Sequence, residues 1–148
     1  MKLEAGVTAA KDSVEGRVWN VVGHIYTPKL LSANAFIWHA VIPDGTFVPP
    51  HVHPTQDEWI EMLDGHLEVE FGADVHTAGP GDIVRMPMGK PHAFYNRSGT
   101  AASCVAGVAP ARRLFDLFIA LNGVSDPEEL VRLSALHEVN FLPPPQAA

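Results

Sequence analysis

Short stretches in which hydrophobic and polar residues alternate fill the chain from about residue 17 to residue 109. In the stretch HLEVEF, Leu67, Val69 and Phe71 share one face of an extended chain, and the polar residues between them share the other. Such a strand places one face in the core and one face in water. Turns rich in glycine and proline separate these stretches, and the pattern predicts strands over 17–26, 34–42, 58–63, 66–71, 82–87, 92–96 and 103–109.

This spacing of short strands is typical of a β-sandwich or barrel. After Pro110 the period becomes helical, and hydrophobic residues recur on one helical face at Leu114, Leu117, Phe118 and Leu121. Gly123 stands where a helix of this register would end. We therefore expect an all-β sandwich or barrel over about 17–109, followed by a helix over about 111–122.

A second C-terminal helix is predicted over about 126–138, because Asp126 suits the N-cap and Pro127 the first turn. Two adjacent helices also suggest a DNA-binding helix-turn-helix. The second helix, however, offers only Arg132 among several acidic residues, which argues against contact with DNA. The last residues, 141–148, predict an extended, fraying tail.

The length and composition favour one soluble domain spanning 1–148. Hydrophobic residues make up 47% of the chain and charged residues 18%, and no apolar run reaches the roughly 18 residues that a membrane span needs. The first residues lack a signal-peptide hydrophobic region, and the single Cys104 does not imply an oxidising compartment. We expect a cytoplasmic protein without a membrane partner.

The charge of the chain argues against nucleic acid as a partner. The formal net charge of −7 at pH 7 repels a phosphate backbone, and no basic cluster is larger than Arg112 with Arg113. We therefore expect no nucleic-acid partner.

The stretch HVHPTQDE places three metal-binding side chains within eight residues. On a strand, His51 and His53 lie on the same face, so both imidazoles can point toward one ion. Glu58 can return on the neighbouring strand and add a carboxylate oxygen. Alone, this group is only suggestive of a metal site.

The spacing around this group resembles the first sequence motif of the cupin superfamily, with Gly45, His51, His53, Glu58 and Gly65 at the motif positions. The second cupin motif is matched by a later stretch, residues 81–96, through Gly81, Pro87, Gly89, His92 and Asn96. The resemblance implies the cupin double-stranded β-helix, a jelly-roll barrel, here followed by the two C-terminal α-helices.

The resemblance also implies that His51, His53, Glu58 and His92 coordinate one divalent metal ion inside the barrel. A structural zinc site would be closed and would use cysteine, so a functional site is favoured. This ligand set accommodates Fe, Ni, Mn, Co or Zn, and the sequence does not choose among them. An octahedral ion with four protein ligands would keep two positions for a substrate or dioxygen.

Strand alternation gives candidates for the wall of a substrate pocket. If Glu58 points into the barrel, Ile60 and Met62 point inward too, and Phe94 follows His92. In the stretch 34–42, either the face with Phe36 and Trp38 or the opposite face can line the barrel.

The segments flanking the barrel resemble the quercetin-dioxygenase-like group of single-domain bacterial cupins. This resemblance implies a metal-dependent dioxygenase acting on an enolic or flavonol-like small molecule, with Glu58, or a water beside it, as the catalytic proton acceptor. A similar centre also serves isomerases, dehydratases and lyases that need no dioxygen, and a non-catalytic binding protein is a third alternative. Barrels of this family commonly form dimers, so a homodimer is expected. The terminal helices would either cap the barrel or meet the partner.

Overall fold

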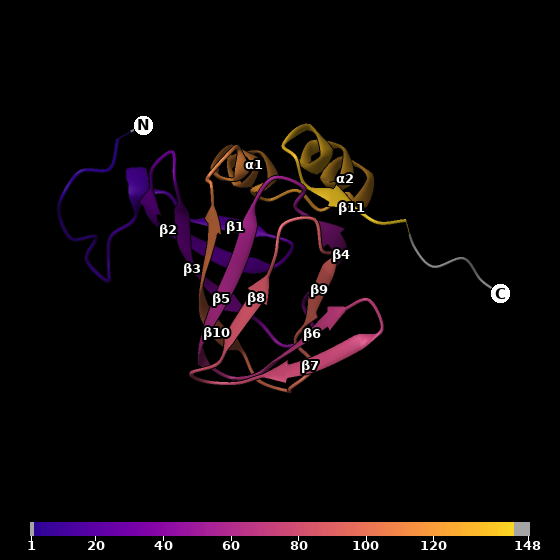
Figure 1. Ribbon diagram of the computed structural model, residues 1–148. Coiled ribbons are helices and arrows are strands. Elements are labelled where there is room, and N and C mark those ends of the chain that lie inside the picture. Colours follow the sequence, from indigo (N-terminus) through magenta and orange to yellow (C-terminus); the bar gives the residue numbers. More distant parts are fainter. Residues whose placement is uncertain (1, 144–148) are drawn as a thin grey trace.

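The computed structural model describes residues 2–143 and consists of two antiparallel sheets that face each other, with two helices over one end (Figure 1). One sheet has the strand order β1-β2-β3-β10-β5-β8, and the other has the order β11-β4-β9-β6-β7. This is the predicted all-β jelly-roll barrel with two C-terminal helices.

The chain passes back and forth between the two sheets. The strand bounds are β1 (Trp19–Val21), β2 (His24–Leu31), β3 (Phe36–Ile42), β4 (Phe47–Val52), β5 (Asp57–Asp64), β6 (Leu67–Phe71), β7 (Asp74–Ala78), β8 (Ile83–Met86), β9 (His92–Tyr95), β10 (Ala102–Ala109) and β11 (Asn140–Phe141). A short 3-10 helix η1 (Val14–Gly16) precedes them, and the helices are α1 (Leu114–Leu121) and α2 (Pro127–Leu136).

The alternation of side chains along the strands builds the barrel core. In β5, Glu58, Ile60 and Met62 are buried, whereas Glu61 and Leu63 are exposed. In β3 the inward face is the one that carries Phe36, Trp38, Ala40 and Ile42, which decides between the two alternatives left by the sequence. Phe94 is buried as well.

The strand predicted over 17–26 is wrong as one element. It is a hairpin of β1 and β2, with Trp19 paired to Tyr26 and a turn at Val22 and Gly23. Both turn residues have positive φ, 51° at Val22 and 87° at Gly23, as a tight two-residue hairpin requires. A β-branched residue such as Val22 rarely adopts this conformation, so the sequence gives no clear sign of a turn at this position.

Strands β4 and β7 lie outside the predicted ranges, although His51 and His53 were expected on a strand. In β4, Pro49 and Pro50 lack the N–H group of a regular ladder, and they lie where the register against β9 shifts, between Val48 and His51. Strand β7 is an edge strand whose residues are mostly exposed, so it lacks the buried alternation of a central strand.

Helix α1 closes one end of the barrel through an aromatic cluster. The ring of Phe115 lies 5.1 Å from that of Trp19, and the ring of Phe118 lies 5.1 Å from that of Trp38 and 4.9 Å from that of Tyr26. At the start of α2, the Asp126 side chain accepts a hydrogen bond from the backbone N–H of Glu128. The helices therefore cover one end of the barrel, which is the first of the two roles that the sequence left open.

The segment after α2 corrects the prediction of a fraying tail. Asn140 pairs with Val52 and Phe141 pairs with His51, and the N–H of Leu142 donates to the carbonyl of Pro50. The rest of the predicted tail, 144–148, lies outside the described residues.

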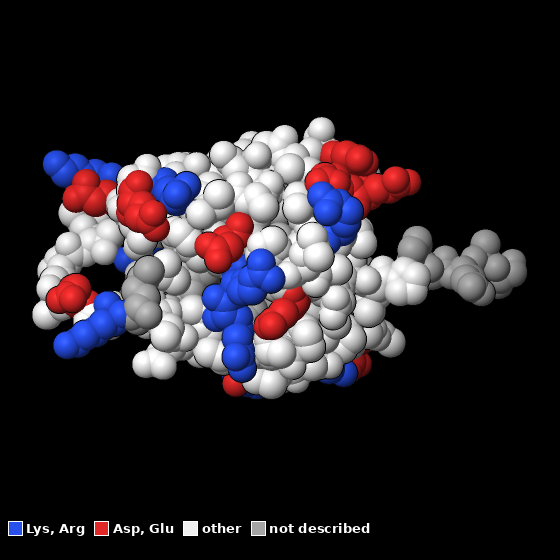
Figure 2. Space-filling view, turned by 90° about the horizontal axis from the view of Figure 1, so that it is seen from above, with Lys and Arg blue, Asp and Glu red and all other residues white. Residues whose placement is uncertain are grey.

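The surface over the capped end carries charges of both signs. Seen from above, Lys and Arg side chains lie interspersed with Asp and Glu, without a continuous basic surface on this face (Figure 2). Among residues 2–143, no helix is long and apolar enough to cross a membrane.

Candidate metal centre

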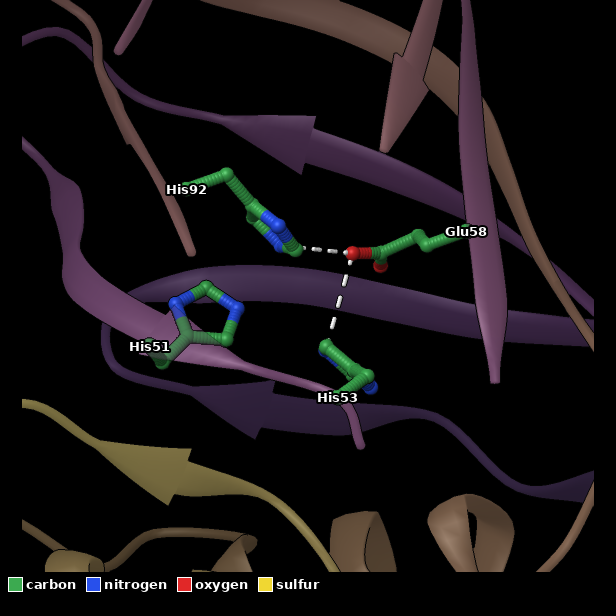
Figure 3. Close-up of side chains that lie close together, drawn as sticks. All are labelled: His51, His53, Glu58 and His92. Atoms are coloured by element: carbon green, nitrogen blue, oxygen red, sulfur yellow. Dashed lines mark ion pairs between the residues drawn. The ribbon is translucent and has the colours of Figure 1, made fainter. Parts of the chain in front are cut away.

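Four buried side chains from three strands converge inside the barrel (Figure 3). His51 lies on β4, and His53 follows its last residue. Glu58 comes from the facing sheet, on β5, and His92 begins β9, where it pairs directly with His51. The structure therefore brings together all four residues that the two sequence motifs single out.

The four side chains are close enough to share one ion. One ligand atom from each residue lies within 4.8 Å of the others. Nε2 of His92 is 3.0 Å and Nε2 of His53 is 3.6 Å from the same oxygen, Oε1 of Glu58. The rings of His51 and His92 lie 4.4 Å apart, centre to centre.

Hydrogen bonds at the outer nitrogens orient the three imidazoles. Nδ1 of His51 lies 2.9 Å from the carbonyl of Pro49, and Nδ1 of His92 lies 3.3 Å from the carbonyl of Lys90. A carbonyl only accepts hydrogen bonds, so each Nδ1 must carry the proton. In the neutral imidazole, Nε2 then presents a lone pair, and in both residues it is free to bind a cation.

Gln56 orients His53 in the same way. The side-chain amide of Gln56 donates to the carbonyls of Pro110 and Ala111, so its oxygen faces Nδ1 of His53 at 3.0 Å and accepts that proton. This fully satisfied amide also joins the histidine to the start of the cap. Sequence reasoning missed Gln56, because its role depends on the approach of a segment more than fifty residues away.

The electrostatics keep the cluster ready for a cation. Burial, with the neighbouring imidazoles of His92 and His53, lowers the pKa of His51 to about 3, so its ring is neutral at pH 7. Burial by itself raises the pKa of Glu58, but its interaction with the imidazoles of His53, His92 and His51 lowers the pKa to about 2, because a proton on any of these rings would pair with the carboxylate. One carboxylate charge thus faces three nitrogen ligands.

Two buried atoms in the cluster lack the partner that their chemistry requires. Oε1 of Glu58 and Nε2 of His92 are 3.0 Å apart, yet neither makes a hydrogen bond within the described residues. Two acceptors at this distance repel each other unless a proton or a cation lies between them. Three imidazoles and one carboxylate are ligands suited to a divalent transition metal, so the residues present fit the ion that the fold family implies.

A cavity of about 60 Å³ lies between the cluster and the cap. His51, His53 and Glu58 form part of its wall, and Trp38 and Phe94 from the predicted pocket line it too. Phe36, Ile60 and Met62 are buried in the core but are not among its lining residues. The remaining wall comes from β1 and β2, from Val48 and from the capping segments, namely Leu114, Leu117, Phe118, Leu121, Leu130, Ser134, Val139 and Phe141.

The role of Gln56 leads to a prediction. Replacing Gln56 by leucine removes the acceptor that fixes the His53 ring, and loss of such a partner typically lowers metal affinity about 10–100-fold. Gln56→Glu keeps an acceptor toward His53 and should lose less affinity, although it gives up both bonds to the cap. Competition titration of Co²⁺ against a chromophoric chelator measures both variants. Wild-type affinity in the leucine variant would rule out the orienting role.

These features define a protein of the cupin fold with a buried group of three histidines and one glutamate. Residues 38–108 match the family profile described as the cupin domain. No curated protein sequence matches the chain significantly.

Solved structures are similar in fold. TT1209 from Thermus thermophilus is 26% identical, with 57% of this chain and 81% of that chain covered and a TM-score of 0.54. KdgF from a Halomonas species is 17% identical, with 76% and 99% covered and a TM-score of 0.67. An RmlC-like cupin from Shewanella frigidimarina is 14% identical, with 78% and 99% covered and a TM-score of 0.67. The two latter likenesses extend over nearly the whole of those chains, and at this identity they show the fold alone.

Proposed function

We propose that the protein is a metal-dependent enzyme that binds one divalent cation through His51, His53, Glu58 and His92 and oxidises a small enolic molecule with dioxygen. The observation that supports this proposal is the buried pair of Oε1 of Glu58 and Nε2 of His92, 3.0 Å apart, which needs either a proton or a cation between its two atoms and has no other partner among the described residues. The resemblance to quercetin-dioxygenase-like cupins supports the reaction class.

The chain supplies binding, orientation and a proton acceptor. The three histidines, each oriented through Nδ1, would hold the cation, which supplies Lewis-acid chemistry and lowers the pKa of a hydroxyl group bound to it. Glu58 lies beside the cavity, and the facing imidazoles lower the pKa of its carboxyl group, so it is ionised and placed to accept that proton.

The cap restricts the size of the substrate and the access of water. One water needs at least about 10–15 Å³ of such space, so the cavity of about 60 Å³ has room for a small molecule only. A compact enol, such as that of a short 1,3-diketone, is close to this size. A flavonol is several times larger and would require the helices to move away from the barrel.

An oxygen electrode tests the proposal. Iron-, nickel-, manganese- and cobalt-loaded protein is incubated with short 1,3-diketones and, separately, with a flavonol. We expect oxygen uptake with a diketone and none with metal-free protein. The absence of uptake with every metal would contradict the dioxygenase function.

A second function with the same centre is an isomerase, dehydratase or lyase that needs no oxidant. The ionised Glu58 beside the cavity supports it, because a positioned carboxylate can remove a proton next to a carbonyl group. Exchange of solvent deuterium into a carbonyl compound under strictly anaerobic conditions would favour this function over the dioxygenase.

A further inference from the structure

Ser134 is a buried polar residue on the capping helix α2 that no role described so far explains. Only 1% of its surface is exposed, and it is one of the residues that line the cavity above the metal centre. Its Oγ makes no hydrogen bond within the described residues. A buried hydroxyl without a partner destabilises the folded chain, so its presence here calls for an explanation.

The backbone of Ser134, rather than its side chain, stabilises the end of the helix. The carbonyl of Ser134 accepts hydrogen bonds from the N–H groups of His137 and Val139, and these bonds end α2 and lead the chain toward β11. Alanine would keep both bonds. The hydroxyl itself therefore contributes nothing visible to the fold.

The other wall residues leave Ser134 as the free hydroxyl of the cavity. Tyr26 is the one other hydroxyl-bearing residue among the lining residues, and its oxygen lies 3.1 Å from Nδ1 of His24. Beyond these two residues and the cluster, the wall consists of valine, leucine, phenylalanine and tryptophan side chains. The walls of this cavity thus carry the metal-binding cluster on the barrel side and, on the cap side, Ser134, a residue whose hydroxyl has no hydrogen-bond partner among the described residues.

We propose that Ser134 positions the substrate by a hydrogen bond to its second polar atom. The substrate class that fits is a short molecule with two polar ends and an apolar middle: one end reaches the cation and the other reaches Oγ of Ser134. This inference rests on the proposed function, because the cation that the first polar end reaches is part of that proposal. The size of the cavity limits the ligand to a few non-hydrogen atoms if the cap stays closed.

Two pairs of isosteric acids test the proposal: 3-hydroxypropanoate with butanoate, and 4-hydroxybutanoate with pentanoate. In each pair a terminal hydroxyl replaces a methyl group of similar size. Calorimetric titration into cobalt-loaded protein should show that the wild type prefers the hydroxy acid of at least one pair about 3- to 10-fold, as one net hydrogen bond allows. Ser134→Ala should bind both members equally.

Thermal unfolding without ligand separates positioning from a structural role. The Tm of Ser134→Ala should equal or exceed that of the wild type, because the substitution removes an unpaired buried hydroxyl. Ser103→Ala, the same change on the outer face of β10, is the control and should keep the ligand preference. A lower Tm for Ser134→Ala with unchanged preference, or no preference in the wild type, would overturn the proposal.

A separate measurement tests whether the cluster binds a cation at all. Absorbance of Co²⁺ on titration into the wild type reports cation binding by the cluster, and Ser134→Ala should bind Co²⁺ as the wild type does. If Co²⁺ does not bind, the proposed function fails. If Co²⁺ binds and the acids are not discriminated, the inference about Ser134 fails by itself.

Discussion

Replacing His92 by alanine should lower the affinity for a divalent transition metal by more than about 100-fold. Loss of the hydrogen-bonding partner of a metal ligand typically costs about 10–100-fold, and removal of the ligand itself costs more. In this protein the loss should be especially large, because Nε2 of His92 lies only 3.0 Å from the Glu58 carboxylate and His92 pairs with His51 across β4 and β9.

Competition titration with Co²⁺ or Ni²⁺ and a chromophoric chelator measures this effect. His76→Ala is the matched control, since His76 is an exposed histidine on β7, outside the cluster. It should bind the metal as the wild type does. An affinity for the His92 variant within a few-fold of that of the control would show that the cluster is not the binding site.

The grouping of His51, His53 and Glu58 could be predicted from the sequence because these residues lie close together in the chain, on or next to neighbouring strands. Side chains two apart on a strand share a face, which placed His51 beside His53 and Glu58 in line with Ile60 and Met62. The distant partner, His92, was found through the spacing of its own motif rather than through physical reasoning. The spacing was informative because it reflects how β4 and β9 pair, with His51 opposite His92.

The pocket could be predicted only in part, because it is formed by segments that meet through tertiary packing. Of the residues predicted for the pocket, Trp38 and Phe94 line the cavity, whereas Phe36 lies in the aromatic core beside Trp19 and Phe115. Phe141 was assigned to a loose tail. It lines the cavity because β11 pairs with the strand that carries His51, a contact between residues ninety positions apart.

The links between the cap and the centre suggest that the two respond together. Gln56 joins His53 to the carbonyls that lead into α1, and Thr55 donates to Glu138 just after α2, at 2.7 Å. The ring of Phe141 lies beside the ring of His51, with ring centres 5.3 Å apart. Ordering of the histidines by a cation should therefore also hold the helices over the cavity.

A bound divalent cation should raise the Tm of the protein by about 8–16 °C. A ligand that binds only the folded state, at about 1,000 times its Kd, stabilises that state by about 4 kcal/mol. For a domain of this size, each kcal/mol shifts Tm by about 2–4 °C. The cation would join β4, β5 and β9, which belong to both sheets, so unfolding of either sheet must release it.

Differential scanning calorimetry of chelator-treated protein, with and without added Co²⁺, measures the shift. The gain should disappear in His92→Ala and persist in His76→Ala, since only the first change removes a member of the cluster. An equal shift in both variants would place the stabilising ion elsewhere on the protein. Co²⁺ should also protect α2 from limited proteolysis in the wild type and should not do so in His92→Ala. This result would show that the bound cation stabilises the cap as well as the cluster.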